Sequence, residues 1–140
     1  MAKIRILGDG AFADFEFEAQ ADSLEELFAQ CGKAVFLAMT DLCNIRAQTA
    51  VEFTVKGETL EDLLFAFLSE LIFIKDTRKI FFCDFIVEIK EGYSIYCKAI
   101  GEPIDRYKHL TKTDVKAATY HKLAIKKTNS GYTVRVILDL

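Results

Sequence analysis

A helix-start pattern that occurs twice constrains the fold of this chain more than any other feature of its sequence. At Ser23, and again at Thr59, a hydroxyl side chain is followed three residues later by a carboxylate, and such a pair satisfies the free backbone N–H groups at the start of a helix. Apolar residues then recur every three to four positions, as they do along one face of a helix. The sequence therefore predicts helices over residues 24–38 and 60–75, each with an apolar face that must be buried.

Outside these two segments, apolar and polar residues alternate with a period of two, which is typical of half-buried strands. Two pairs of such runs follow the second helix, and each pair flanks a turn sequence, Glu91-Gly92 in the first and Asn129-Ser130-Gly131 in the second. Each pair therefore predicts a hairpin. The predicted strands span residues 15–20, 51–55, 81–90, 93–100, 114–126 and 132–140.

This order of elements favours an α+β fold. A doubly wound parallel sheet needs a steady alternation of strands and helices, whereas here four strands follow the second helix without interruption. We expect an antiparallel or mixed sheet covered by the two helices. With one proline and no Gly/Ser-rich linker or internal repeat, the sequence offers no domain boundary, so residues 1–140 are expected to form a single domain.

The composition excludes several classes of protein. Half of the residues, 51%, are hydrophobic and 12 are Phe, which excludes intrinsic disorder. The most apolar stretch, residues 60–74, is interrupted by three carboxylates and cannot span a membrane. The N-terminus reaches Gly8 and Asp9 before a signal-peptide core could form, so we expect a cytoplasmic protein. The net charge of −3 argues against direct RNA binding as the main activity.

No known catalytic motif occurs in the sequence, and no catalytic residue is predicted. The phosphate-binding, dinucleotide-binding, hydrolase and zinc-protease patterns are all missing. The four cysteines are widely spaced, which favours buried thiols in a reducing compartment over disulfides or zinc. Of the two histidines, His121 lies in a predicted strand, where we expect a structural role, and His109 lies in a polar segment, where we expect exposure to solvent.

Carboxylates near the two ends of the chain are the most interesting polar groups. Asp14 precedes the first predicted strand, and Asp139 stands next to the α-carboxylate of Leu140. If these three groups converged, their oxygens could bind Mg²⁺, Mn²⁺ or Ca²⁺. The sequence does not show that they converge, and on the residues alone two solvated aspartates at strand ends are the simpler interpretation.

From about Asp14 onward, the chain resembles the archease family. The resemblance rests on four segments in the family's order and spacing, and the third contains the most specific motif, Thr113-Asp114-Val115-Lys116-Ala117-Ala118-Thr119-Tyr120-His121. The four segments are Ala13-Asp14 with residues 23–26 and 38–42, residues 57–71, Gly101-Glu102-Pro103 with His109 and residues 113–121, and residues 134–140.

The resemblance implies a function and a site. Archeases are protein cofactors of the RtcB-type RNA ligase, which joins RNA halves in tRNA splicing with GTP and a divalent metal, and they assist its guanylylation and its repeated turnover. They also bind a divalent cation, here Ca²⁺, Mg²⁺ or Mn²⁺. On this chain the implied metal ligands are Asp14, Asp139 and the backbone oxygens of Leu140, and tRNA would be reached only through the ligase.

Other interpretations stay open. Lys116, Thr119, Tyr120 and His121 match the family's strongest motif and could support the metal site or face the ligase, but packing of a strand explains them equally well. A metal-dependent enzyme that acts on phosphoesters is the alternative function, and a general chaperone is a third.

The chain departs from the family pattern just before Asp14. Archeases usually carry His-Thr-Ala-Asp there, whereas this chain has Ala11-Phe12-Ala13-Asp14. Loss of a polar pair beside a ligand can weaken metal binding. Asp9 could substitute for it. Glu16 replaces a common glycine and either adds a carboxylate to the site or lies on the exposed face of the strand.

Overall fold

The computed structural model describes residues 2–9, 14–109 and 111–140. Two long helices, a short 3-10 helix and eight strands occur within these residues. In chain order they are β1 (Lys3–Asp9), β2 (Asp14–Ala21), α1 (Leu24–Leu37), η1 (Leu42–Asn44), β3 (Thr49–Lys56), α2 (Leu60–Arg78), β4 (Ile80–Lys90), β5 (Ser94–Pro103), β6 (Ala117–Ala118), β7 (Ala124–Thr128) and β8 (Gly131–Asp139).

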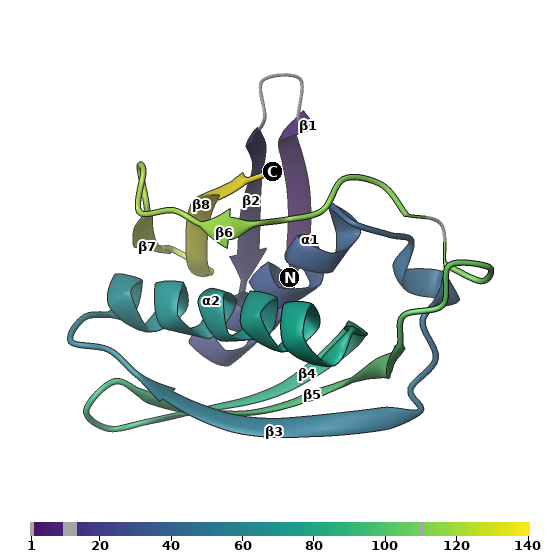
Figure 1. Cartoon of the computed structure of the whole chain (residues 1–140). Helices are drawn as coiled ribbons and strands as arrows, with labels where there is room; N and C mark the ends of the chain where they lie inside the picture. The colour runs from purple at the N-terminus through teal and green to yellow at the C-terminus, as the bar shows by residue number, and fades with distance from the viewer. Residues whose placement is uncertain (1, 10–13, 110) are drawn as a thin grey trace.

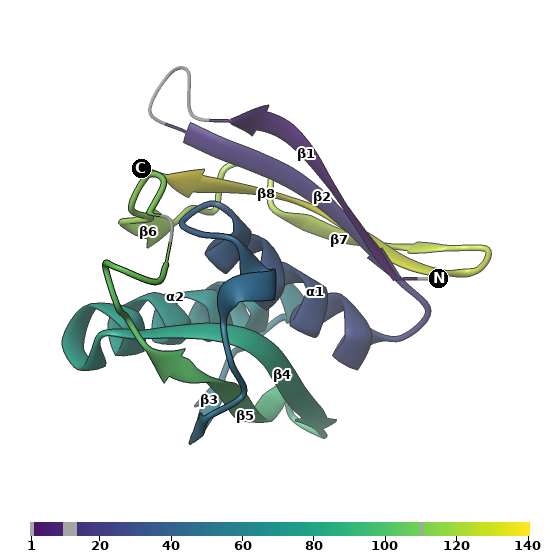
Figure 2. The same cartoon turned by 90° about the vertical axis from the view of Figure 1, so that its right-hand side faces the viewer.

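The elements form three layers, with the two helices between two antiparallel sheets (Figures 1 and 2). The five-stranded sheet has the order β1-β2-β8-β6, with β7 also paired to β8, and the three-stranded sheet has the order β3-β5-β4. Helix α1 packs against β2 and β8 on one side and against β4 on the other. The α+β class is therefore confirmed, but the strands divide into two sheets and the helices lie between them.

The sequence pattern explains why both helices are covered from two sides. Helix α1 buries a wide surface that includes Leu27, Phe28, Cys31 and Phe36. Such a surface is broader than the single stripe of a helix that lies on one sheet. Aromatic rings fill the space toward the three-stranded sheet, where Phe36 packs edge-on against Phe82 with 5.5 Å between ring centroids.

Both predicted helix starts are confirmed. The Ser23 hydroxyl accepts a hydrogen bond from the Glu26 N–H at 3.2 Å, and the Thr59 hydroxyl accepts one from the Asp62 N–H at 3.1 Å. Helix α2 continues past its predicted end and stops where Lys79 adopts a left-handed conformation with a φ of 55°. The last residues, 76–78, were not predicted because they are polar and exposed and do not continue the apolar pattern.

The strand prediction is wrong at two places. Strand β1 was not predicted, although apolar and charged residues alternate over residues 3–6. The long strand predicted over residues 114–126 is broken into β6 and β7 by a turn in which Lys122 has a φ of 56°. Residues 114–116 and 119–123 therefore lie outside β6 and β7, and they include the four motif residues Lys116, Thr119, Tyr120 and His121.

Helix α2 holds the chain where the predicted strand is broken. The Tyr120 ring stacks on the Phe65 ring of α2 at 4.0 Å, and its hydroxyl donates to Asp62 Oδ1 at 3.1 Å. Glu61, in the first turn of α2, accepts a hydrogen bond from the Ile125 N–H of β7 at 2.9 Å. Contacts with the helix thus replace part of the hydrogen bonding that a continuous strand would make.

The four cysteines are free, and their environments differ. Cys31 and Cys97 are buried, as predicted, and burial raises the pKa of the Cys97 thiol to about 12. Cys83 is half-buried, and Cys43 is exposed in η1, so the prediction of a buried thiol is wrong at Cys43. Neither α1 nor α2 is apolar enough over a sufficient length to cross a membrane.

Replacing Gly101 with alanine should destabilise the protein by about 2–3 kcal/mol. A Cβ at Gly101 would lie 1.9 Å from the carbonyl oxygen of Phe81, where β4 approaches β5 beside a β-bulge. Urea denaturation measures the loss. Gly92→Ala is the control, because Gly92 has a φ of 78° but open space around it, and it should cost about 1 kcal/mol. Equal losses in the two variants would contradict the prediction.

Candidate functional site

The structure brings together the two aspartates that the sequence left far apart. Strands β2 and β8 pair antiparallel, and Asp14 is the register partner of Asp139. Side chains at directly opposed positions lie about 5 Å apart at Cβ and share one face of the sheet. Leu140 follows Asp139 immediately, so its α-carboxylate lies at the same end of the sheet, beside the start of β2 (Figure 1).

The aspartate pair lies on the outer face of the five-stranded sheet. Phe15 and Leu138, the next opposed pair, are buried on the inner face, whereas Asp14 and Asp139 are exposed. Figure 2 shows that, among the elements the structure describes, none covers the outer face of this sheet. The two carboxylates are therefore accessible from outside the molecule.

The carboxylate from Glu16 is not free to join the pair. Glu16 lies on the same strand face as Asp14, but its side chain forms an ion pair with Arg135 at 2.9 Å. Within residues 2–9, 14–109 and 111–140, no three His, Cys, Asp or Glu side chains cluster to hold a metal. The α-carboxylate of Leu140, which follows Asp139 directly, is the third group that the sequence singled out for this site.

The sequence singled out three residues before Asp14 that could affect the site: Asp9, Ala11 and Phe12. The backbone of Asp9 lies opposite Phe15 in the β1–β2 ladder. Ala11 and Phe12, which stand where archeases usually have His-Thr, lie outside the described residues.

The four residues of the Thr113–His121 motif that we singled out divide into three environments. The Lys116 N–H donates to the Asp139 carbonyl oxygen at 2.8 Å, and the Thr119 hydroxyl donates to the Ile137 carbonyl oxygen at 2.8 Å. Both residues therefore hydrogen-bond to the backbone at the end of β8. Tyr120 instead packs on α2, and His121 is exposed in the turn between β6 and β7, so a structural role for His121 within a strand is wrong.

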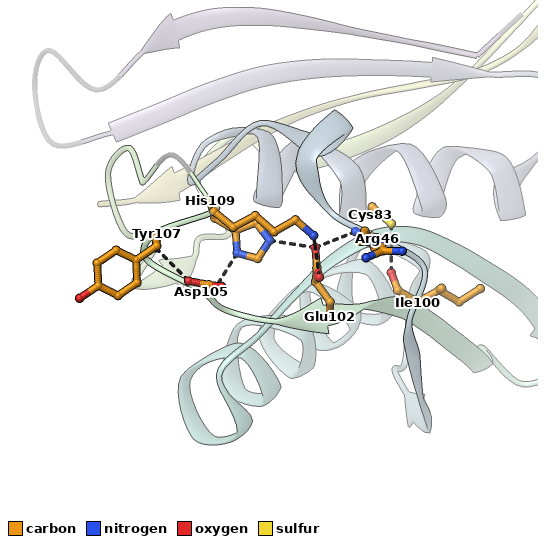
Figure 3. Close-up of polar contacts among 8 residues, drawn as sticks. Arg46, Cys83, Ile100, Glu102, Asp105, Tyr107 and His109 are labelled. Carbon is orange, nitrogen blue, oxygen red and sulfur yellow. Dashed lines mark hydrogen bonds and ion pairs between the residues drawn. The ribbon is translucent and has the colours of Figure 1, made fainter.

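A second polar cluster, buried at the end of the three-stranded sheet, was not predicted (Figure 3). Glu102 of β5 is 5% exposed and accepts hydrogen bonds from the Arg46 N–H at 2.8 Å and from Lys108 Nζ at 2.6 Å. His109 Nε2 lies 3.0 Å from the same carboxylate, and His109 Nδ1 accepts a hydrogen bond from the Asp105 N–H at 3.0 Å. Because Nδ1 is an acceptor, we assign the proton to Nε2, which donates to Glu102.

His109 is buried, so its predicted surface position is wrong. Its side chain is 0% exposed, and its ring packs edge-on against Phe81 at 5.4 Å. The polar segment around His109 predicted exposure because the sequence does not show that the loop after β5 folds back to place His109 against the buried Glu102, seven residues earlier. Without access to solvent, His109 cannot take a proton from a substrate. Its contacts with Glu102 and the Asp105 N–H instead hold the loop that follows β5 in place.

The same contacts keep Glu102 ionised. The hydrogen bond from Lys108, followed by those from the Arg46 N–H and from His109, lowers the pKa of the Glu102 carboxyl to about 2. Glu102 therefore carries a charge at neutral pH.

Comparison with known proteins gives one family. The family model of the Archease protein family matches residues 10–140. An archease of Pyrococcus abyssi is 39% identical over 122 residues, which is 85% of this chain and 86% of that protein. The solution structure of Methanobacterium thermoautotrophicum protein 1598 superposes with a TM-score of 0.84 at 33% identity and covers 98% of both chains. The crystal structure of a Thermotoga maritima archease, described as a possible chaperone, has a TM-score of 0.65 at 23% identity and covers 91% of both chains, which shows a shared fold.

Replacing Glu102 with glutamine should lower the free energy of unfolding at pH 7. The difference between the variant and the wild type should disappear in acid. A carboxyl group with a pKa of about 2 in the folded protein and an ordinary value of 4.5 stabilises the fold above pH 4.5. That contribution disappears as the pH falls from 4.5 toward 2.

Chemical denaturation at a series of pH values from 3 to 7 measures this difference. Glu91→Gln, in the exposed turn between β4 and β5, is the control and should behave like the wild type at each pH. A Glu102→Gln deficit that is the same at pH 3 and pH 7 would contradict the prediction.

Proposed function

Because this chain belongs to the archease family, we propose that it is a protein cofactor of a GTP-dependent, RtcB-type RNA ligase and that it binds a divalent cation. The ligase partnership follows from the family resemblance. The site proposed for the cation comprises Asp14, Asp139 and the α-carboxylate of Leu140.

The observation that carries the metal site is the register of β2 and β8. Like charges placed directly opposite each other destabilise a pair of strands. Asp14 and Asp139 are so placed, and among the described residues neither forms an ion pair. A bound cation would remove this repulsion, and carboxylate oxygens are the ligands that Ca²⁺, Mg²⁺ and Mn²⁺ prefer.

The openness of the site favours a cofactor over an enzyme. Small-molecule sites are usually concave and bury most of the ligand, whereas Asp14 and Asp139 are exposed on an uncovered sheet face. When bound, the ion supplies a concentrated positive charge at this end of the sheet. The chain holds the ion there within reach of a second macromolecule, which fits a factor that acts on a ligase and meets tRNA only through that ligase.

Replacing Asp139 with asparagine should abolish divalent-ion binding and leave the fold intact, because the loss of one of three charged ligands removes most of the attraction for a hard cation. Calorimetric titration with Ca²⁺ and with Mn²⁺ measures binding, and circular dichroism reports the fold. Glu16→Gln is the matched control: it removes a carboxylate from the same sheet face, but one already paired with Arg135, and should bind normally. Unchanged binding by Asp139→Asn would exclude this set of ligands.

The ligase partnership is tested by adding the protein to its cognate ligase with GTP, metal and RNA ends. The wild type should convert a slow or single-turnover reaction into many turnovers, and Asp14→Asn should reduce that stimulation at least tenfold. No stimulation by the wild type would remove the proposal. Metal-dependent phosphoester hydrolysis by the isolated protein would support the enzyme alternative, and capture of many unrelated proteins would support the chaperone alternative.

A further inference from the structure

A buried lysine at the end of α2 makes polar contacts that the proposed function does not use. Lys75 is 4% exposed, and lysine is almost never buried without a partner. Its ammonium group lies 2.6 Å from Asp114 Oδ1 and 2.5 Å from Asp76 Oδ1, and it donates to the carbonyl oxygen of Val115 at 3.1 Å. One side chain of α2 thus holds two consecutive residues of the segment that precedes β6.

That segment carries the chain from one sheet to the other. After β5 it leaves the three-stranded sheet and runs to β6 in the five-stranded sheet (Figure 1). On the way, the Lys112 N–H donates to the Met39 carbonyl oxygen at 2.8 Å. The contacts of Lys75 with Asp114 and Val115 come next and fix the segment over the end of α2.

The residue after Val115 connects this anchor to the carboxylate pair. The Lys116 N–H donates to the carbonyl oxygen of Asp139 at 2.8 Å, and Ala117 is the register partner of Asp139 in the β6–β8 ladder. Asp139 therefore lies between Asp14 on one side and this segment on the other. Without the segment, the last residues of β8 would keep hydrogen bonds on one edge only, and chain ends that are held loosely fray.

We infer that Lys75 is a positioning residue for the carboxylate site: it fixes residues 114–116, and these residues hold Asp139 opposite Asp14. The inference rests on the proposed metal site. Metal ligands must be held within a fraction of an ångström, and the groups that orient them typically change metal affinity 10–100-fold when they are lost. Methionine at position 75 would fill a similar volume but could not bind Asp114 or the Val115 carbonyl.

The test compares Lys75→Met with Asp76→Asn. Asp76 contacts the same ammonium group but lies on α2 itself, so its loss leaves the link to the segment in place. Amide hydrogen exchange is measured by NMR without metal, at the Lys116 N–H and at the Cys97 N–H of β5 as a reference on the other sheet. Affinity for Mn²⁺ is then measured by calorimetry.

In Lys75→Met, the Lys116 amide should exchange about tenfold faster relative to the Cys97 amide, and Mn²⁺ should bind about tenfold more weakly. Asp76→Asn should change both quantities less than threefold. Unchanged exchange at Lys116 would overturn the inference, and so would an equal acceleration at Lys116 and Cys97, because that would show a general loss of stability. If Lys75→Met does not fold, Asp114→Asn serves as the second variant with the same expected results.

The exchange measurement keeps this inference separate from the proposed metal site. If the wild type binds no Mn²⁺, the metal site fails, and the exchange at Lys116 alone decides whether Lys75 positions the end of β8. If the wild type binds Mn²⁺ and Lys75→Met binds it equally well, the metal site stands and the role of Lys75 is refuted.

Discussion

The antiparallel pairing of β2 with β8 is the constraint on which the rest of the structure depends. It joins the first and last strands of the matched family region over eight residue pairs, from Asp14 with Asp139 to Ala21 with Tyr132. The inner face of this ladder is part of the core, and the outer face carries the carboxylates. Because side chains alternate between faces, a slip of one residue would bury the aspartates and expose the core residues. The register that packs the core therefore also assembles the candidate site.

Local signals explain what could be predicted from the sequence. The caps at Ser23 and Thr59 fixed the starts of both helices, and the turn at Glu91-Gly92 fixed a hairpin. These features depend on residues a few positions apart. The division into two sheets depends on which strands pair across long distances, and no local pattern encodes it. Strand β1 is different, since residues 3–6 carry a local alternation of charged and apolar side chains.

The candidate site shows the same division between local and distant information. The resemblance to archeases singled out Asp14 and Asp139, and the structure supplies the register that makes them neighbours. Nothing within either local sequence predicts that register. Glu102 and His109 were missed as a pair although they stand only seven residues apart, because their contact depends on how the loop after β5 folds back. A glutamate between a glycine and a proline at the end of an apolar strand was a signal that the position is special.

One hydrogen bond of α2 has a consequence for the behaviour of the protein at high concentration. Strand β7 pairs with β8 along one edge, and the unpaired N–H groups of an edge strand can recruit a strand from another molecule. Glu61 occupies one such N–H group, that of Ile125, with a carboxylate fixed at the start of a helix. An incoming strand would have to displace the Glu61 carboxylate and approach its negative charge closely. Helix α2 therefore protects this edge of the sheet from β-association with another molecule.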